Sequence, residues 1–331
     1  MNISLKEISV RGLAIFGARE KKKDESWRRR RALRRIDSDL EKGNFKAALS
    51  LAKQLQGKPG GLLGFGSVKL IPQRGSKVDE LEVNGADNLS VRLLVDSIQR
   101  SIKCCLRFAL EEQEDAQRSI GSLTDGDAGL VLAQDHFESS DDYSLLSNDR
   151  MMCLKHEAGH FLVGYLLGVL PKRYKIPTME DLIRNNYAGG NVEFLGFEFL
   201  REASVSASSL PYISSVKEKQ SNKGYARLIS SKTLSRFLCV ILGGLVAEHL
   251  VYGYSELLHS DVEKLDRVLR WSGFKEDEAD FQVKWAAINT VLLLREHHQA
   301  TSRLTEAMAL KKSIGFCIDT IESTLNHSNK S

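Results

Sequence analysis

The chain has 331 residues, of which 42% are hydrophobic and 27% are charged, so its composition is that of a globular protein with a buried core. Its 5 prolines and 25 glycines exclude a collagen-like or generally disordered chain. The net charge of +4 is too small for a protein that coats nucleic acid, so we expect no nucleic-acid partner. Five cysteines without a C-x-x-C pair argue against a disulfide framework and favour a reducing compartment.

The basic residues are concentrated near the N-terminus. Residues 19–35 contain ten Lys and Arg against three acidic residues. Such a run is usually a solvated helix face or tail, and the alternative is peripheral contact of residues 19–35 with an anionic membrane. The first 19 residues are basic and poor in acids, as organelle-targeting segments are. We therefore predict a flexible basic segment over residues 1–35.

Residues 36–118 are expected to form a helical region. Apolar spacings of three and four predict two short helices between Arg30 and Gln56, broken at Gly43, and a long amphipathic helix over residues 89–118. The Gly-rich connector 57–72 lies between them. It lacks the Lys-Ser/Thr pair that follows the glycines of a P-loop, so we interpret it as an ordinary loop and identify no ATP site in the sequence.

A polar stretch over residues 119–147 is predicted to be a linker before a second domain, residues 148–326. In that domain we expect helices over about 148–170, 232–252, 260–271, 277–299 and 302–325, and a strand over 191–199. The expected fold class is therefore mainly α with a small β-sheet. The longest apolar run, Phe237–Ala247, is shorter than a membrane span of roughly 20 residues, so we predict a buried helix and no transmembrane span.

The motif that carries chemistry is His156-Glu157-Ala158-Gly159-His160, in the first helix of this domain. Histidines four residues apart on a helix lie on one face and can both bind one Zn²⁺. Glu157 is rotated by about 100° from His156, which places its carboxylate as a general base beside a zinc-activated water. A surface helix with two solvated histidines is the alternative. The apolar flanks disfavour it, as does Gly159, which costs about 1 kcal/mol relative to Ala.

A catalytic zinc site has three protein ligands, and the motif supplies two histidines and a base. One ligand must therefore come from elsewhere in the chain. Val163 and Leu166 stand where a metzincin has Gly and His, which excludes that class. Glu180 lies at the distance of a thermolysin-like third ligand, but in a loop after a proline. The remaining candidates are Glu248, His249, His259 and Asp261.

These motifs and their order resemble the FtsH peptidase family, in particular the plant FtsH-like proteins that lack the ATPase module. HEAGH is followed by LGGLVAE at 242–248 and by Ser-Asp at the start of a later helix, where the family usually has Ser-Asn-Asp after a longer loop. The resemblance implies that His156, His160 and Asp261 bind one zinc ion per chain, with Glu157 as the catalytic base. It also implies that Glu248 lies close to the ligands, and His259 is the alternative third ligand.

The resemblance implies an FtsH-peptidase-like helical metalloprotease domain after the N-terminal helical region, a chloroplast location, and the function of a zinc endopeptidase. Its substrate would be an unfolded or extended polypeptide. An exposed edge of the strand 191–199 could hold it by strand addition, and the alternative is that this segment is an ordinary core strand. Without its own ATPase domain, the chain would need extended substrates, an ATPase-bearing FtsH-type partner, or assembly into a homo-oligomer. The alternatives are a catalytically silent pseudoprotease that acts as a scaffold or chaperone-like partner, and a basic-tailed membrane adaptor with an incidental motif.

Overall fold

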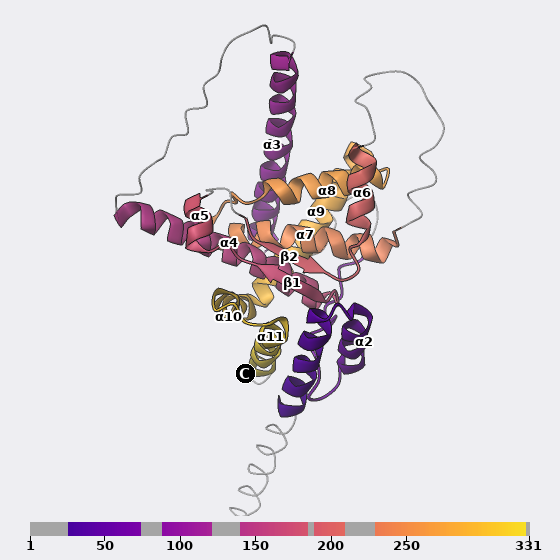
Figure 1. The fold of residues 1–331 in the computed structure, drawn as a ribbon. Coiled ribbons are helices and arrows are strands. Elements are labelled where there is room, and N and C mark those ends of the chain that lie inside the picture. Colours follow the sequence, from indigo (N-terminus) through magenta and orange to yellow (C-terminus); the bar gives the residue numbers. More distant parts are fainter. Residues whose placement is uncertain (1–25, 74–87, 121–139, 185–188, 209–228, 329–331) are drawn as a thin grey trace, which may run out of the picture.

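The computed structural model describes residues 26–73, 88–120, 140–184, 189–208 and 229–328 (Figure 1). Residues 1–25 of the segment that we expected to be flexible, and 121–139 of the expected linker, lie outside the described residues.

The described chain is mainly helical with one small sheet, as the sequence predicts (Figure 1). A first helix covers residues 26–41. The other helices are α2 (Phe45–Leu55), α3 (Asn88–Ile120), α4 (Ser140–Leu166), α5 (Met179–Arg184), α6 (Phe199–Ser208), α7 (Ser231–Tyr252), α8 (His259–Trp271), α9 (Glu276–Glu296), α10 (His298–Ala309) and α11 (Ile314–Ser328). Helix α4 begins eight residues before the predicted start near residue 148.

The sheet differs from the prediction. It pairs β1 (Pro171–Lys175) with β2 (Asn191–Phe194) in antiparallel register, with Tyr174 opposite Val192. The predicted strand 191–199 is therefore too long, because the chain turns at Gly196, whose φ is 101°. The apolar residues beyond this turn leave the sheet and pack edge-to-face against Phe237 of α7. Strand β1 was not predicted, since its sequence PKRYK has no apolar alternation.

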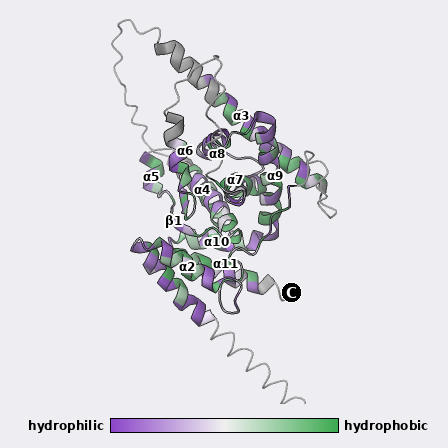
Figure 2. Ribbon diagram, turned by 90° about the vertical axis from the view of Figure 1, so that its right-hand side faces the viewer, coloured by the Kyte–Doolittle hydropathy of each residue, from purple (hydrophilic) through white to green (hydrophobic). Residues whose placement is uncertain are grey.

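The core is built around the contact between α4 and α7, with α9 packed on α7 (Figure 1). Figure 2 shows the hydrophobic residues of α7 near the middle of the molecule. A Cβ on Gly159 of α4 would collide with the carbonyl oxygen of Gly243 of α7, and a Cβ on Gly243 would lie 2.9 Å from the carbonyl oxygen of Gly159. These two glycines allow the helix backbones to touch.

Among the described residues, α7 is the helix that is long and apolar enough to cross a membrane. Within its most apolar window, 72% of the residues are buried inside the structure, which is typical of a core helix. The structure therefore shows no clear membrane span in the described part of the chain.

The C-terminal segment forms two helices where the sequence predicted one over 302–325. Lys311 adopts a left-handed φ of 52° and its N–H donates to the carbonyl of Met308, which ends α10. Asp37 then accepts the backbone N–H of Gly315 at 2.6 Å and the Ser313 hydroxyl at 2.7 Å, and so holds the start of α11. The break was missed because a lysine occupies a turn position that usually holds glycine.

The basic segment is not solvated throughout, because residues 26–35 belong to the helix 26–41. The Arg29 side chain is buried and donates to Asp319 at 2.6 Å and to Ser323 at 3.0 Å, both on α11. Leu33 and Ile36 enter the same hydrophobic cluster as residues of α4, α7 and α11. One core thus includes residues from the expected N-terminal region and from the expected peptidase-like domain.

The Gly-rich connector packs against the end of α4. The N–H groups of Gly66 and Val68 donate to the carbonyls of Tyr165 and Leu166, at 3.1 and 3.2 Å. The buried Glu322 carboxylate of α11 accepts the N–H groups of Leu63 and Gly64, at 3.0 and 2.7 Å. These hydrogen bonds hold the connector against α4 and α11, in agreement with its interpretation as an ordinary loop.

Candidate metal centre

Helix α4 carries the two histidines and the glutamate of the motif. His156 and His160 are four residues apart, so their imidazoles lie one turn apart on the same helix face. Both histidines and Glu157 are buried, with 4–6% of each residue exposed. The alternative of two solvated histidines on a surface helix is therefore wrong.

The third member of the group is Asp261, in the first turn of α8. Its Oδ2 lies 3.0 Å from His156 Nε2 and 2.8 Å from His160 Nε2, and the two Nε2 atoms are 2.9 Å apart. A residue 105 positions away in the sequence thus closes a nearly equilateral triangle of buried ligand atoms. This group could hold a metal ion.

The triangle fits a small divalent cation. A tetrahedral zinc ion with bonds of about 2.0–2.1 Å holds its ligand atoms about 3.3 Å apart, so separations of 2.8–3.0 Å need an outward movement of only a few tenths of an ångström. Three protein ligands would leave a fourth coordination position open. An open position is the feature that separates catalytic zinc sites from structural ones.

Charge in the triangle also favours a cation. Burial opposes the charge on His156, but its hydrogen bonds to Asp261 and Glu248 outweigh burial and raise its pKa to about 10. Burial likewise opposes the charge on Asp261, yet His160 and His156 together hold the pKa of Asp261 well below its usual range. A metal ion bound by these atoms would take the place of the protons that these pairings stabilise.

The buried Glu248 of α7 orients His156. Its Oε1 accepts a hydrogen bond from His156 Nδ1, which directs Nε2 into the triangle and makes it the nitrogen that a metal ion would use. Its Oε2 accepts the backbone N–H groups of Glu256 and Leu257, at 2.8 and 3.4 Å. Glu248 therefore lies beside a ligand without joining the triangle, in the position that the sequence analysis expects.

The second histidine is oriented by backbone. His160 Nδ1 lies 2.7 Å from the carbonyl oxygen of Val240 and 3.3 Å from the backbone nitrogen of Gly244. The shorter contact assigns a proton to Nδ1, so Nε2 is the nitrogen that is available to a metal ion held together with Asp261. A Cβ on Gly244 would lie 2.5 Å from the His156 ring, so the glycines of α7 let both imidazoles approach its backbone.

Glu157 lies beside the triangle and is not part of it. Its Oε2 is buried and has no hydrogen-bond partner among the described residues. Burial raises the pKa of Glu157. The backbone of Gly190 covers its other oxygen closely, since a Cβ there would lie 2.7 Å from Oε1. A buried carboxylate oxygen without a donor is costly, and this one is placed to accept a proton from a molecule in the cavity.

The other candidate ligands do not join the triangle. His259 lines the same cavity, but it is exposed and its Nδ1 contacts Cys105 Sγ at 3.3 Å. His249 points toward α3, with Nε2 3.4 Å from the Ser101 hydroxyl. Glu180 was expected in a loop and lies instead in the first turn of the short helix α5, where it is exposed and outside the cavity lining. The structure thus brings together His156, His160 and Asp261 and leaves these alternatives outside.

A cavity of about 900 Å³ opens at the triangle. Its lining includes Glu157, the two histidines, Asp261 and all of β2. One edge of β2 pairs with β1, and within the described chain no strand pairs with the other edge.

Lys264, which was not predicted as a site residue, also lines the cavity and donates to Asp261 Oδ1 at 3.2 Å. Its position one turn after Asp261 on α8 was the available signal.

No model of a known protein family matches the sequence, and a comparison with curated proteins finds no match. The resemblance to FtsH-like peptidases rests on the short motifs, and the chloroplast location that it implies gains no support from these comparisons.

Proposed function

We propose that the protein is a zinc-dependent endopeptidase of the FtsH-like type. The observation that carries this proposal is the buried triangle of His156, His160 and Asp261, with the unpartnered carboxylate oxygen of Glu157 beside it, at the wall of a large cavity. Two imidazoles and one carboxylate with an open fourth position are a typical ligand set for catalytic zinc. A scaffold that binds no substrate at this site would have no use for the unpartnered Glu157.

In this proposal, bound zinc supplies Lewis-acid chemistry that lowers the pKa of a water molecule in the cavity. Glu157 accepts the proton of that water as the water attacks the peptide carbonyl, and then returns the proton to the leaving amine. Glu248 and the Val240 carbonyl keep the two imidazoles in the orientation that the ligand set requires. Lys264 balances the charge of Asp261 on the oxygen that faces away from the histidines.

The proposed substrate is an extended polypeptide. The residues of β2 line the cavity, and the edge of β2 that pairs with no described strand carries backbone N–H and C=O groups that can pair with a peptide in β conformation next to Glu157. An extended substrate is already unfolded or is delivered by an ATPase-bearing partner. Strand pairing uses hydrogen bonds to the substrate backbone more than contacts with its side chains. It therefore favours a broad range of substrate sequences.

The test is metal content and casein hydrolysis, measured on the same samples of wild type and three variants. We expect one zinc per chain in wild type and in His259→Ala, with cleavage that a chelator abolishes. Asp261→Ala should lose zinc and activity, because two ligands remain. Glu157→Gln should keep zinc and lose cleavage, since only the base is removed.

The outcomes separate the possible functions. Zinc in wild type without cleavage of casein or of any unfolded protein would favour the pseudoprotease. Iron in place of zinc would reject the peptidase, because two histidines and one carboxylate also form the iron site of oxygenases. Absence of any metal from wild type would reject both the zinc peptidase and an iron oxygenase.

A further inference from the structure

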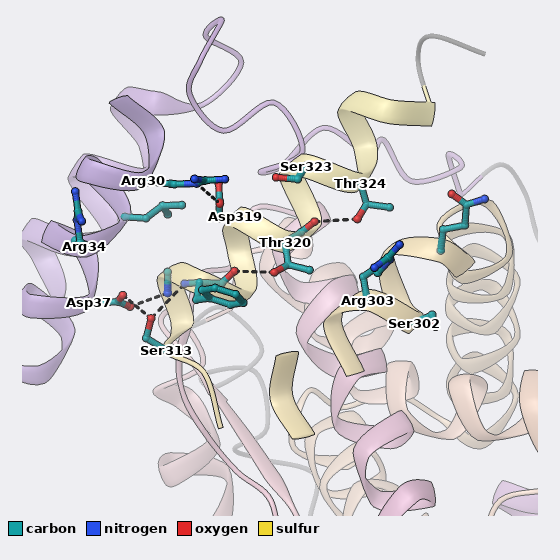
Figure 3. Close-up of a pocket in the computed structure, with 14 residues that line it drawn as sticks. Arg30, Arg34, Asp37, Ser302, Arg303, Ser313, Asp319, Thr320, Ser323 and Thr324 are labelled. Carbon is teal, nitrogen blue, oxygen red and sulfur yellow. Dashed lines mark hydrogen bonds and ion pairs between the residues drawn. The ribbon is translucent and has the colours of Figure 1, made fainter. Parts of the chain in front are cut away.

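A groove of about 1030 Å³ among the helix 26–41, α10 and α11 shares no lining residue with the cavity at the metal centre (Figure 3). Its two carboxylates, Asp37 and Asp319, already accept hydrogen bonds across the contact between the helix 26–41 and α11 (Figure 3). A buried carboxylate oxygen without a partner among the described residues lies instead at the metal centre, on Glu157.

Gly190 lies directly against Glu157. A Cβ on Gly190 would lie 2.5 Å from Cγ and 2.7 Å from Oε1 of Glu157, and 2.8 Å from Sγ of Cys153. Carbon atoms in ordinary contact are about 3.5–4.0 Å apart, so position 190 has no room for a side chain. Gly190 is not one of the described glycines with a left-handed φ, so its backbone conformation does not require glycine. The space beside Glu157 does.

The backbone at Gly190 is held from two sides. It forms a hydrogen bond with Cys153, which is buried on α4 one turn before Glu157. It also directly precedes Asn191, the first residue of β2, which pairs with Lys175 of β1. A methyl group at position 190 would therefore displace the Glu157 side chain more readily than the segment itself.

This contact distinguishes the two oxygens of Glu157. Oε1 faces the backbone of Gly190, whereas Oε2 is buried and has no partner among the described residues. Both Gly190 and Glu157 line the cavity at the metal centre. A general base must lie within about 2.6–3.2 Å of the group whose proton it takes, so a fixed carboxylate is an advantage.

We propose that Gly190 is a positioning residue of the peptidase, which holds Glu157 so that Oε2 accepts the proton of the attacking water. The inference rests on the proposed function and gives the chain around β2 two roles. The free edge of residues 191–194 pairs with the substrate, and the residue before them sets the position of the base. Substrate and base are thus oriented by one continuous segment.

The first test is the steady-state kinetics of labelled casein hydrolysis by the zinc-loaded full chain. Gly190→Ala should lower kcat by about 100-fold, because a shift on the order of 1 Å in a catalytic group can cost that much. Its zinc content should equal that of wild type, and KM should stay within about twofold, because the ligands and the edge of β2 are unchanged. The matched control is Gly189→Ala, in which the new Cβ meets nothing within 4 Å, and its kcat should stay within about twofold of wild type.

The second test does not depend on cleavage. Acetohydroxamate binds zinc and gives its N–OH proton to a neighbouring base, and calorimetry measures its affinity for the zinc-loaded chain. Glu157→Gln should weaken this binding by about tenfold, the value of a hydrogen bond to a charged group, and Gly190→Ala should weaken it by a similar factor. The double variant should bind no more weakly than Glu157→Gln alone, because Gly190 acts through Glu157.

The outcomes separate this inference from the proposed function. A wild-type kcat in Gly190→Ala would overturn the inference, as would additive losses of hydroxamate affinity in the double variant. A raised KM with unchanged kcat would also overturn it and assign Gly190 to substrate binding. Wild type that binds zinc without cleaving casein would reject the proposed function alone, since the hydroxamate measurements still decide whether Gly190 positions Glu157. Wild type without zinc would reject both.

Discussion

At the scale of single residues, the orientation of the ligands depends on groups that are not ligands. Glu248 is fully buried, yet its Oε1 accepts from His156 and its Oε2 accepts two backbone N–H groups of the segment that leads into α8. One carboxylate thus ties a ligand on α4 to the chain that carries Asp261. Removing a partner of this kind typically costs 10- to 100-fold in metal affinity.

We predict that Glu248→Gln weakens zinc binding by about 10- to 100-fold without removing any ligand. The glutamine amide can accept only through one atom, so its NH₂ group would face either His156 or the N–H of Glu256. Competition with a chromophoric chelator measures the affinity. Glu256→Gln is the control, because that side chain is exposed and only its backbone N–H is used. Equal affinities of Glu248→Gln and wild type would contradict this role.

The local part of the site was predictable, and the distant part was not. His156, Glu157 and His160 stand within five residues, so helix periodicity alone placed them on neighbouring faces. The position of Asp261 depends on how α8 packs against α4, and spacing alone left several candidate ligands open. Lys264 was missed because a lysine on an exposed helix face is common, and only the position of Asp261 makes it distinctive.

At the scale of elements, the crossing of α4 and α7 determines whether the site can form. The two backbones touch at Gly159 and Gly243, next to the histidines. We predict that Gly159→Ala lowers the free energy of unfolding by roughly 1–3 kcal/mol, although alanine favours a helix by about 1 kcal/mol in the absence of contacts. The added methyl must push α7 away, because the atom it meets is a backbone oxygen.

Denaturant unfolding of the metal-free chain measures this effect. Gly189→Ala is the control, since a Cβ there meets nothing within 4 Å, and it should change stability by no more than about 0.5 kcal/mol. A Gly159→Ala chain that is as stable as wild type would show that the two helices can separate without cost.

Element boundaries were predictable where periodicity is strong and failed where a contact overrides it. The limits of α7 and α8 agree with the sequence within a residue. The predicted strand after Asn191 was too long because Phe197 and Phe199 pack against Phe237 in the core and do not belong to the sheet. The start of α11 after the turn at Lys311 is held by Asp37, which is distant in sequence.

At the scale of the whole molecule, the N-terminal helices belong to the same core as the metal helix. Glu322 of α11 shows why: its buried carboxylate accepts from the N–H of Leu63, from the N–H of Gly64 and from the hydroxyl of Tyr165, at 3.0, 2.7 and 2.6 Å. This single group joins the Gly-rich connector, the end of α4 and the C-terminal helix. Sequence patterns divided these segments into separate regions because hydrogen bonds between distant residues leave no periodic signal.

We predict that Glu322→Gln lowers the free energy of unfolding by about 1–3 kcal/mol, because the glutamine NH₂ would leave at least one of the three buried donors without an acceptor. Tyr165→Phe is the matched control. It removes one donor and leaves the carboxylate its two backbone partners, so its cost should be nearer 1 kcal/mol. Urea unfolding followed by Trp fluorescence measures the stability of both variants.

If the N-terminal helices and the metal helix form one cooperative unit, hydrogen exchange in Glu322→Gln will accelerate in α2 and in α4 together. Faster exchange in the connector alone, with α4 unchanged, would show that the N-terminal region unfolds independently of the site.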